Sequence, residues 1–278
     1  MPEDAETTMP MQSMYKSLLG GIAWLCQTRM DIYVYVVALQ RHNQAPKVLH
    51  VRRINTLLKW IRRKRCSLVY KCHVFVRVTV KVISDSAFKG ETATALAMRG
   101  AIICIGEWLE NTMAGLCHIL EFYASRQKRV TRSTLGAETR GLADESDIGK
   151  VITVAVTEIE GHPLSTTAAR DLELTGFDLV RMEACTDARS LFDALKSEDS
   201  RTPTEVSMLY DLAALRESLV TKRIHRLWWI DTRDMIADGL TKGVIAREPM
   251  IAFSNSGMWE RKHEAISYIA PYKPLCEA

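Results

Sequence analysis

The chain has 278 residues, an apolar content of 47% and a formal net charge of +4. This length accommodates one large domain, or one medium domain with an appended piece, and the apolar content supplies a core and excludes wholesale disorder. The acidic N-terminus does not resemble a secretory signal, and the longest apolar run, 32–39, is too short to span a bilayer.

Seven cysteines are scattered along the chain without a Cys-x-x-Cys pair. An odd, scattered set favours reduced thiols over a disulfide framework. We therefore expect an intracellular protein of the cytoplasm or nucleus, which is neither secreted nor embedded in a membrane.

Residues 13–63 have the apolar spacing of helices. Apolar side chains recur at helical intervals after Ser13, Pro46 interrupts the pattern, and the spacing resumes over 50–63. We expect the apolar residues to form a core and the arginines around them to be exposed.

The period then changes to that of strands. Apolar and polar residues alternate over 74–82 and lead into Ser84-Asp85-Ser86, and further strands are predicted at 98–105 and 117–130. A turn or an insertion is expected at 106–115. Three strands in succession with short connections indicate an antiparallel meander.

The remaining elements alternate between helix and strand. We predict a helix from Ser133 past Val151, a strand at 174–185, helices at 188–196 and 205–219, a strand at 227–230 and a closing helix at 232–243. The order is βββαβαβα with one extra helix. It predicts an α/β fold in which helices face a mixed sheet.

Four acids stand in these elements in the order Asp85, Glu138, Asp187 and Asp238. Asp85 and Asp187 follow β-like runs, Glu138 lies one turn into the long helix, and Asp238 lies in the closing helix. Carboxylates that converge repel each other unless divalent cations neutralise them, so the pattern indicates Mg²⁺. A nuclease with two cations needs such carboxylates to hold the ions about 4 Å apart.

Each acid also has a simpler interpretation. Asp85 and Asp187 are typical of turns or helix caps. Glu138 is compatible with a solvated helix position, and Asp238 with a surface acid that the helix dipole favours.

Positive charge is concentrated in one stretch. Twelve Lys and Arg and no Asp or Glu lie between Arg41 and Lys81. This indicates a polyanionic partner such as nucleic acid, although a solvated helix face gives the same pattern. The candidate nucleic-acid-binding residues are Arg52, Arg53, Arg62, Arg63, Lys64, Arg65, Arg129 and Arg132.

Five segments, in order, resemble a copia-type retrotransposon polyprotein. They cover the end of its reverse transcriptase and the ribonuclease H domain that follows. The segments are Tyr-Lys-Ser-Leu-Leu-Gly at 15–20 with Gln-Thr-Arg-Met-Asp-Ile at 27–32, Ser-Asp-Ser-Ala-Phe at 84–88, Arg-Ser-Thr-Leu-Gly-Ala-Glu at 132–138, Thr-Asp-Ala-Arg-Ser-Leu at 186–191 and Ala-Asp-Gly-Leu-Thr-Lys at 237–242. Met30 replaces a proline of the family's pattern.

The resemblance implies a ribonuclease H-like fold with an N-terminal helical extension. Residues 1–67 would be a helical remnant of the reverse transcriptase connection region, 68–245 the ribonuclease H-like domain and 246–278 a C-terminal tail. The polymerase's catalytic turn has no counterpart in the sequence, so no polymerase activity is expected.

The activity that the resemblance implies is Mg²⁺-dependent endonucleolytic cleavage of the RNA strand of RNA–DNA hybrids. Asp85, Glu138, Asp187 and Asp238 would be both catalytic residues and ligands of two Mg²⁺ ions, with Mn²⁺ as a substitute. Asp234 competes for the last position, but the family's motif places the acid directly after an alanine. His225 is a candidate for a role in product release.

Two other interpretations stay open. One is an inactive retroelement remnant that acts at most as a nucleic-acid-binding module. The other is a transposase-like or integrase-like nuclease, against which the order of the acids argues, because that group carries its glutamate last.

Overall fold

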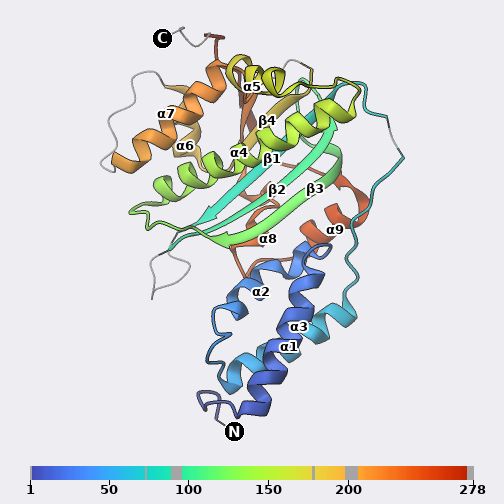
Figure 1. Cartoon of the computed structure of the whole chain (residues 1–278), viewed down its shortest axis with the longest axis vertical. Coiled ribbons are helices and arrows are strands. Elements are labelled where there is room, and N and C mark those ends of the chain that lie inside the picture. The colour runs from blue at the N-terminus through green and yellow to red at the C-terminus, as the bar shows by residue number, and fades with distance from the viewer. Residues whose placement is uncertain (1, 73, 89–95, 177–178, 198–205, 274–278) are drawn as a thin grey trace.

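The computed structural model describes residues 2–72, 74–88, 96–176, 179–197 and 206–273. A helical unit at the N-terminus lies below a sheet that carries helices on both faces (Figure 1). The architecture is mixed α/β, as the sequence predicted.

The N-terminal unit consists of three helices and one 3₁₀ turn. Tyr15 joins two of the helices, because its hydroxyl donates to the carbonyl of Leu39 at 2.7 Å. Their apolar faces form a core of their own around Ile54. The predicted helical region and its break at Pro46 are confirmed, with α1 at Met9–Leu25, η1 at Met30–Ile32, α2 at Tyr33–Gln40 and α3 at Val48–Arg63.

Helix α2 connects the N-terminal helical unit to the sheet and to the segment after α8 (Asp238–Thr241). The ring of Tyr33 meets Phe122 of the sheet edge-on, with 6.1 Å between centroids. The hydroxyl of Tyr35 donates to the carbonyl of Gly243 at 2.8 Å. The helical unit therefore contacts the sheet through α2 rather than through the basic helix α3.

Seven strands form one sheet in the order β6-β3-β2-β1-β4-β5-β7. The first three strands pair antiparallel, which confirms the predicted meander, and β1, β4 and β5 pair in parallel. The strands are β1 at Val78–Ala87, β2 at Met98–Glu107, β3 at Gly115–Arg126, β4 at Arg181–Thr186, β5 at Arg226–Ile230, β6 at Met258–Trp259 and β7 at Ala265–Tyr268.

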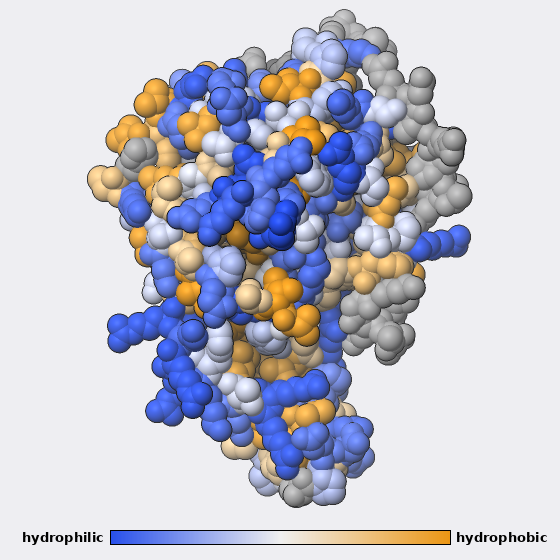
Figure 2. Space-filling view, turned by 180° about the vertical axis from the view of Figure 1, so that it is seen from behind, coloured by the Kyte–Doolittle hydropathy of each residue, from blue (hydrophilic) through white to orange (hydrophobic). Residues whose placement is uncertain are grey.

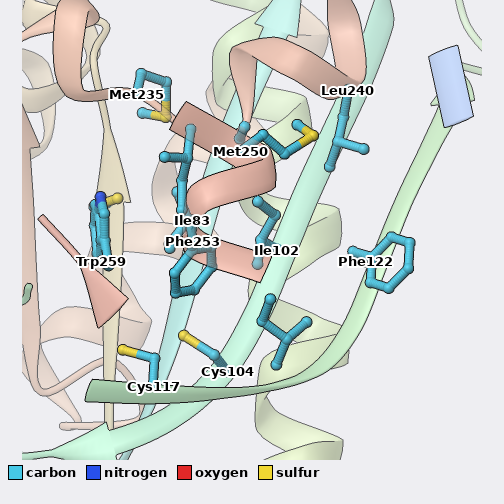
Figure 3. Close-up of a cluster of buried hydrophobic side chains, with 14 of the residues drawn as sticks. Ile83, Ile102, Cys104, Cys117, Phe122, Met235, Leu240, Met250, Phe253 and Trp259 are labelled. Carbon is cyan, nitrogen blue, oxygen red and sulfur yellow. The ribbon is translucent and has the colours of Figure 1, made fainter. Parts of the chain in front are cut away.

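Helices cover both faces, because alternate side chains of the central strand point to opposite sides. Val80 and Val82 face the layer of α4 (Thr134–Ile159), α6 (Arg189–Lys196) and α7 (Val206–Val220). Ile83 faces the layer of α8 (Asp238–Thr241) and α9 (Glu248–Ser256). Figure 3 shows Leu240, Met250 and Phe253 over Ile83 and Ile102 in this second layer.

Two predicted strands begin later in the structure than the sequence indicated. The alternation over 74–82 begins before β1 does: Val74 and Val76 are exposed, and Glu107 accepts the backbone N–H groups of Val76 and Arg77. Residues 74–77 belong to no strand of the described chain, so alternation alone does not make this segment β-structure. The strand predicted at 174–185 begins later, at Arg181, and helix α5 (Thr166–Thr175) precedes it. Residues 177–178 of the predicted strand and Glu205 of the predicted helix 205–219 lie outside the described residues.

The closing helix predicted at 232–243 is two short pieces, η2 (Thr232–Asp234) and α8. The stretch 246–278, expected as a tail, carries α9 and two strands that extend the sheet at both edges. Strand β6 pairs with β3, and β7 pairs with β5. Both strands are too short to show a periodic sequence pattern, so the sequence did not predict them.

A buried charged row crosses the sheet at the end where β1, β4 and β5 begin. Lys81, Glu183 and Arg226 are neighbours in register on three adjacent strands, and each is at most 1% exposed. Arg226 Nε lies 2.7 Å from Glu183 Oε1, and Trp228 Nε1 donates to the same oxygen at 2.8 Å.

The connection between β2 and β3 closes over this row. Arg226 donates to the carbonyl of Glu110 at 2.7 Å, and Lys81 donates to that of Met113 at 2.8 Å. The ring of Trp108 lies 3.9 Å from the guanidinium of Arg226. The predicted turn or insertion at 106–115 therefore covers the charged row, and its backbone carbonyls accept hydrogen bonds from the buried cations.

No helix in the described part of the chain has both the length and the apolarity needed to cross a bilayer.

We expect Arg226→Met to lower the free energy of unfolding by about 3–5 kcal/mol, because it leaves the Glu183 carboxylate buried without its guanidinium partner. Urea denaturation followed by circular dichroism measures this loss. Arg52→Met is the control: Arg52 pairs with Glu3 at 3.1 Å, but both side chains are more than half exposed, so the loss should stay below about 1 kcal/mol. Equal losses in the two variants would contradict the prediction.

Candidate metal centre

Two of the four predicted acids are brought together by the parallel pairing of β1 with β4. Asp85 lies near the end of β1, and Asp187 follows directly after β4. The two strands pair from Thr79 with Arg181 to Ile83 with Cys185 and run in the same direction. The carboxyl ends of these two central strands therefore lie side by side, at the end of the sheet where both strands finish.

Glu138 reaches the same end of the sheet from α4. Ser133 caps this helix, since its hydroxyl accepts the N–H of Gly136 at 3.0 Å, which fixes where the helix begins. A methyl group at Gly141 would lie 2.3 Å from the hydroxyl of Ser86, so only glycine lets α4 approach β1 this closely. Glu138 lies one turn before that contact and extends over the end of the sheet.

Asp238 is delivered by α8, which lies on the opposite face from α4. A methyl group at Gly100 would lie 2.6 Å from Cβ of Leu240, so only glycine lets α8 approach β2 this closely. Gly100 is in turn the antiparallel partner of Asp85. The contact places the first residue of α8 beside the Asp85 carboxyl.

The acids converge as predicted. One carboxylate oxygen from each of Asp85, Glu138 and Asp187 lies within 4.8 Å of the others. Asp238 lies against this trio, within hydrogen-bonding reach of Asp85. Asp85 and Glu138 are only 1% and 4% exposed, and Oε2 of Glu138 is buried without a hydrogen-bond partner in the described chain.

The pKa of every one of these carboxyls is raised. Burial is the main cause in each case, and repulsion between the acids adds to it. The pKa of Asp85 rises to about 6, through burial and the charge of Asp238. The pKa of Glu138 rises well above its usual range, through burial and then Asp85 and Asp187. The fold thus buries the carboxyl groups close together, which raises the free energy of their charged forms.

Three neighbouring side chains orient the acids. The hydroxyl of Thr241 donates to Asp85 Oδ2, and Thr232 donates to Asp187 Oδ2 at 2.8 Å. Lys242 Nζ donates to Asp238 Oδ1 and lies 3.6 Å from Asp85 Oδ1. Burial lowers the pKa of Lys242, but the surrounding carboxylates outweigh this and raise it, so the side chain is a cation.

Asp234, the competitor of Asp238, is occupied elsewhere. Its carboxylate accepts the backbone N–H groups of Lys262 and His263 at 3.0 and 2.7 Å and contacts the ring Nδ1 of His263 at 2.9 Å. It therefore fixes the turn before β7. The acid that joins the cluster is Asp238.

His225 lies at the wrong end of the sheet for a role beside these acids. It directly precedes β5, which runs parallel to β1 and β4, whereas the acids lie where β1 and β4 end. Its ring stacks edge-on against Trp108, with 5.0 Å between centroids. The expected role in product release is therefore wrong on geometric grounds.

Glu145 is a fifth acid that the sequence analysis missed. It is fully buried on α4, and its charge acts on both Glu138 and Cys185. Burial is the main cause that raises its pKa well above the usual range. It follows Glu138 by seven residues, or two helical turns, and that spacing was a signal that both side chains share one helix face.

The candidate nucleic-acid-binding residues are all exposed, and they form two separate groups. Arg129 and Arg132 lie in the connection between β3 and α4, close to the start of the helix that carries Glu138. The other six, on α3 or just after it, lie on the helical unit. Figure 2 shows hydrophilic side chains projecting from the lower part of the molecule, where Figure 1 places α1 to α3.

A hollow of about 460 Å³ adjoins Arg129. It is lined by four cations and two carboxylates together with one apolar residue, namely Arg99, Lys128, Arg129, Arg140, Asp144, Asp147 and Ile148. Arg99 lies on β2 opposite Ser86, next to the strand position of Asp85. Arg99 and Arg140 were not among the candidates, and each is paired with an acid, Arg99 with Asp144 and Arg140 with Asp211 at 2.9 Å.

The donor set fits a hard divalent cation. Asp85, Glu138 and Asp187 offer only carboxylate oxygens, which Mg²⁺ and Mn²⁺ prefer, and neither histidine nor cysteine belongs to this group. A cation there would also give the orphaned Oε2 of Glu138 a partner.

An uncharacterized mitochondrial protein of Arabidopsis thaliana is 27% identical to the chain over 135 residues. The match covers 48% of this chain and 51% of that protein, so the chain spans about half the length of the curated relative it matches. No protein-family model matches the chain, and the comparison with solved structures gave no match.

We expect Asp85→Asn to stabilise the protein at pH 8 in EDTA by roughly 1–3 kcal/mol, because each unit of pKa shift corresponds to about 1.4 kcal/mol. A carboxyl whose pKa is raised on folding contributes stability that is fully present below its unfolded pKa of about 4. That contribution is lost as the pH rises through the folded pKa of about 6. The advantage of the variant should therefore vanish near pH 4.

Urea midpoints of both proteins at pH 4 and pH 8 measure this difference. The control is Asp147→Asn, whose carboxylate is 74% exposed and should make no such pH-dependent difference. An Asp85→Asn variant that is destabilised equally at both pH values would show that the carboxyl is not under electrostatic stress.

Proposed function

We propose that the chain is a ribonuclease H-type endoribonuclease derived from a retrotransposon polyprotein. It cleaves the RNA strand of RNA–DNA hybrids and depends on Mg²⁺, for which Mn²⁺ substitutes. Asp85, Glu138, Asp187 and Asp238 are the catalytic carboxylates.

The carboxyl of Glu138 carries this proposal. It is 4% exposed, its Oε2 is buried without a partner in the described chain, and it points to a place where oxygens of Asp85 and Asp187 lie within 4.8 Å. Most buried polar atoms are hydrogen-bonded, so an orphaned oxygen that also faces two other carboxyl groups calls for an explanation. A buried carboxylate directed at two others is what a divalent cation requires.

The topology supports the proposal as well. The sheet joins an antiparallel meander to parallel strands, with α4 and α5 between β3 and β4, in agreement with the chain order βββαβαβα with one extra helix that the sequence predicted. The acids come from the central strand, the next strand and two helices, in the expected sequence. The retrotransposon origin rests on the five sequence segments, which match the family's order.

The side chains around the acids hold them in place for the reaction. Thr241 orients Asp85, and Thr232 orients Asp187. Burial keeps water from separating Asp85 and Glu138. A divalent cation held by Asp85, Glu138 and Asp187 supplies Lewis-acid polarisation of a phosphoryl oxygen.

The charge distribution supports a nucleic-acid duplex as the substrate. Arg129 and Arg132 directly precede the helix that carries Glu138, and Arg129 lines the hollow, so both would meet phosphates of a duplex bound at the acids. An RNA–DNA hybrid is recognised by shape, phosphates and 2′-hydroxyls rather than by base edges. Binding through such contacts weakens steeply as salt increases.

A second candidate function is that of a non-catalytic nucleic-acid-binding module. The exposed arginines of α3 favour it, because they are separate from the acids and need no metal. Hybrid binding that falls with salt, ignores Mg²⁺ and is lost in an Arg62→Ala, Arg63→Ala double variant, without any cleavage, would support this function instead.

The full chain should cleave the RNA strand of a fluorescently labelled hybrid when Mg²⁺ is present and should stop when EDTA is added. Asp85→Asn and Glu138→Gln should each slow cleavage at least ~100-fold, which is on the order of 3 kcal/mol of transition-state stabilisation. Denaturing gel electrophoresis of the products measures the rate.

Glu158→Gln is the matched control, because Glu158 is an exposed acid on the helix of Glu138, outside the hollow, and should keep full activity. No RNA cleavage by the wild type, or cleavage that survives Asp85→Asn, would refute the enzymatic function.

Two acids four residues apart should behave differently. Asp238→Asn should lose cleavage activity to the same degree as Asp85→Asn. Asp234→Asn should keep cleavage activity but melt at a lower temperature, because the turn at 262–263 loses its acceptor. Cleavage assays and thermal melts on both variants test this, and the opposite pattern would make Asp234 the fourth acid.

A further inference from the structure

Lys242 enters the acid cluster from its open side. It follows α8 directly and lies one helical turn after Asp238, so its ammonium group reaches the carboxylate of that residue. The side chain is 33% exposed, whereas that of Asp85 is 1% exposed. The lysine therefore extends from the surface into a set of buried acids.

Its charge acts on the whole cluster. The pKa of each of the four acids is raised by burial, and the positive charge of Lys242 opposes this rise in every one of them. The four acids are Asp85, Glu138, Asp187 and Asp238. The ammonium group is thus placed as a counterion to all four acids rather than to one surface partner.

The ammonium group does not occupy the cluster evenly. It donates directly to Asp238 Oδ1, but it lies 3.6 Å from Asp85 Oδ1, beyond hydrogen-bonding distance. Asp85 therefore keeps a lone pair for another partner, as do Asp187 and the orphaned Oε2 of Glu138. One cation position is open, and the neighbouring one, between Asp85 and Asp238, is filled by the lysine.

We propose that the ammonium group of Lys242 holds the place of a second cation. The protein then binds one divalent ion, at Asp85, Glu138 and Asp187, where the four carboxylates alone would bind two. A second divalent ion between Asp85 and Asp238 would meet a positive charge already hydrogen-bonded to one of its ligands, and like charges at such distances repel strongly in a buried site. This inference rests on the proposed function, which supplies the metal.

The test counts the bound ions and requires no substrate. Mn²⁺ is titrated into the metal-free full chain, and free Mn²⁺ is measured by electron paramagnetic resonance. We expect the wild type to bind one ion per chain and Lys242→Met to bind two, because methionine has a similar length and no charge. Lys242→Arg keeps the charge and should bind one.

Lys150→Met is the matched control, since Lys150 pairs only with the exposed Asp147 in the described chain and its loss should leave the count at one. Because Lys242→Met leaves carboxylates unpaired, its fold is checked by circular dichroism in Mn²⁺, and Lys242→Gln provides a second neutral side chain.

Two ions in the wild type, or one ion in both neutral variants, would overturn the inference and leave the proposed function standing. A wild type that binds none would overturn both.

Discussion

The parallel pairing of β1 with β4 is the constraint on which the candidate site depends. It places Asp85 and Asp187 at one edge of the sheet, and the ladder between the strands prevents the two carboxylates from moving apart. The same pair of strands carries Lys81 and Glu183 at the opposite end, where a buried charged row and the 108–114 connection fix it. One end of the pair therefore carries opposite charges that attract each other, and the other end holds carboxyl groups that repel each other.

Helices complete the site from both faces because glycine allows them to come close. Gly141 brings α4 onto β1, and Gly100 brings α8 onto β2, each at a distance that a methyl group would prevent. Glu138 and Asp238 thus reach the sheet edge from opposite sides. The raised pKa values of these acids follow from this arrangement, since burial and mutual repulsion both disfavour the charged forms. A bound divalent cation would relieve the repulsion that the fold imposes.

Strong local patterns made most of the fold predictable. The alternation of β1, the helical spacing of α4 and the order of the central elements were read correctly, because long periodic segments carry a clear signal. Short elements were not predicted: β6 and β7 span two and four residues, too few for any period to appear. The alternation of Val74 and Val76 was misleading, since both side chains are exposed and their backbone joins no strand of the described chain.

The sequence by itself determined which acids are candidates and in what order they come, because each stands at a recognisable position within its element. The family's motif favoured Asp238 over Asp234, and only the tertiary structure gave the physical reason: Asp238 shares Lys242 with Asp85, whereas Asp234 accepts backbone N–H groups of the turn at 262–263. It also removed His225 from the site, since the direction of β5 puts that residue at the far end of the sheet. Glu145 and Lys242 became part of the site in the same way, because burial and proximity between distant segments are properties of packing.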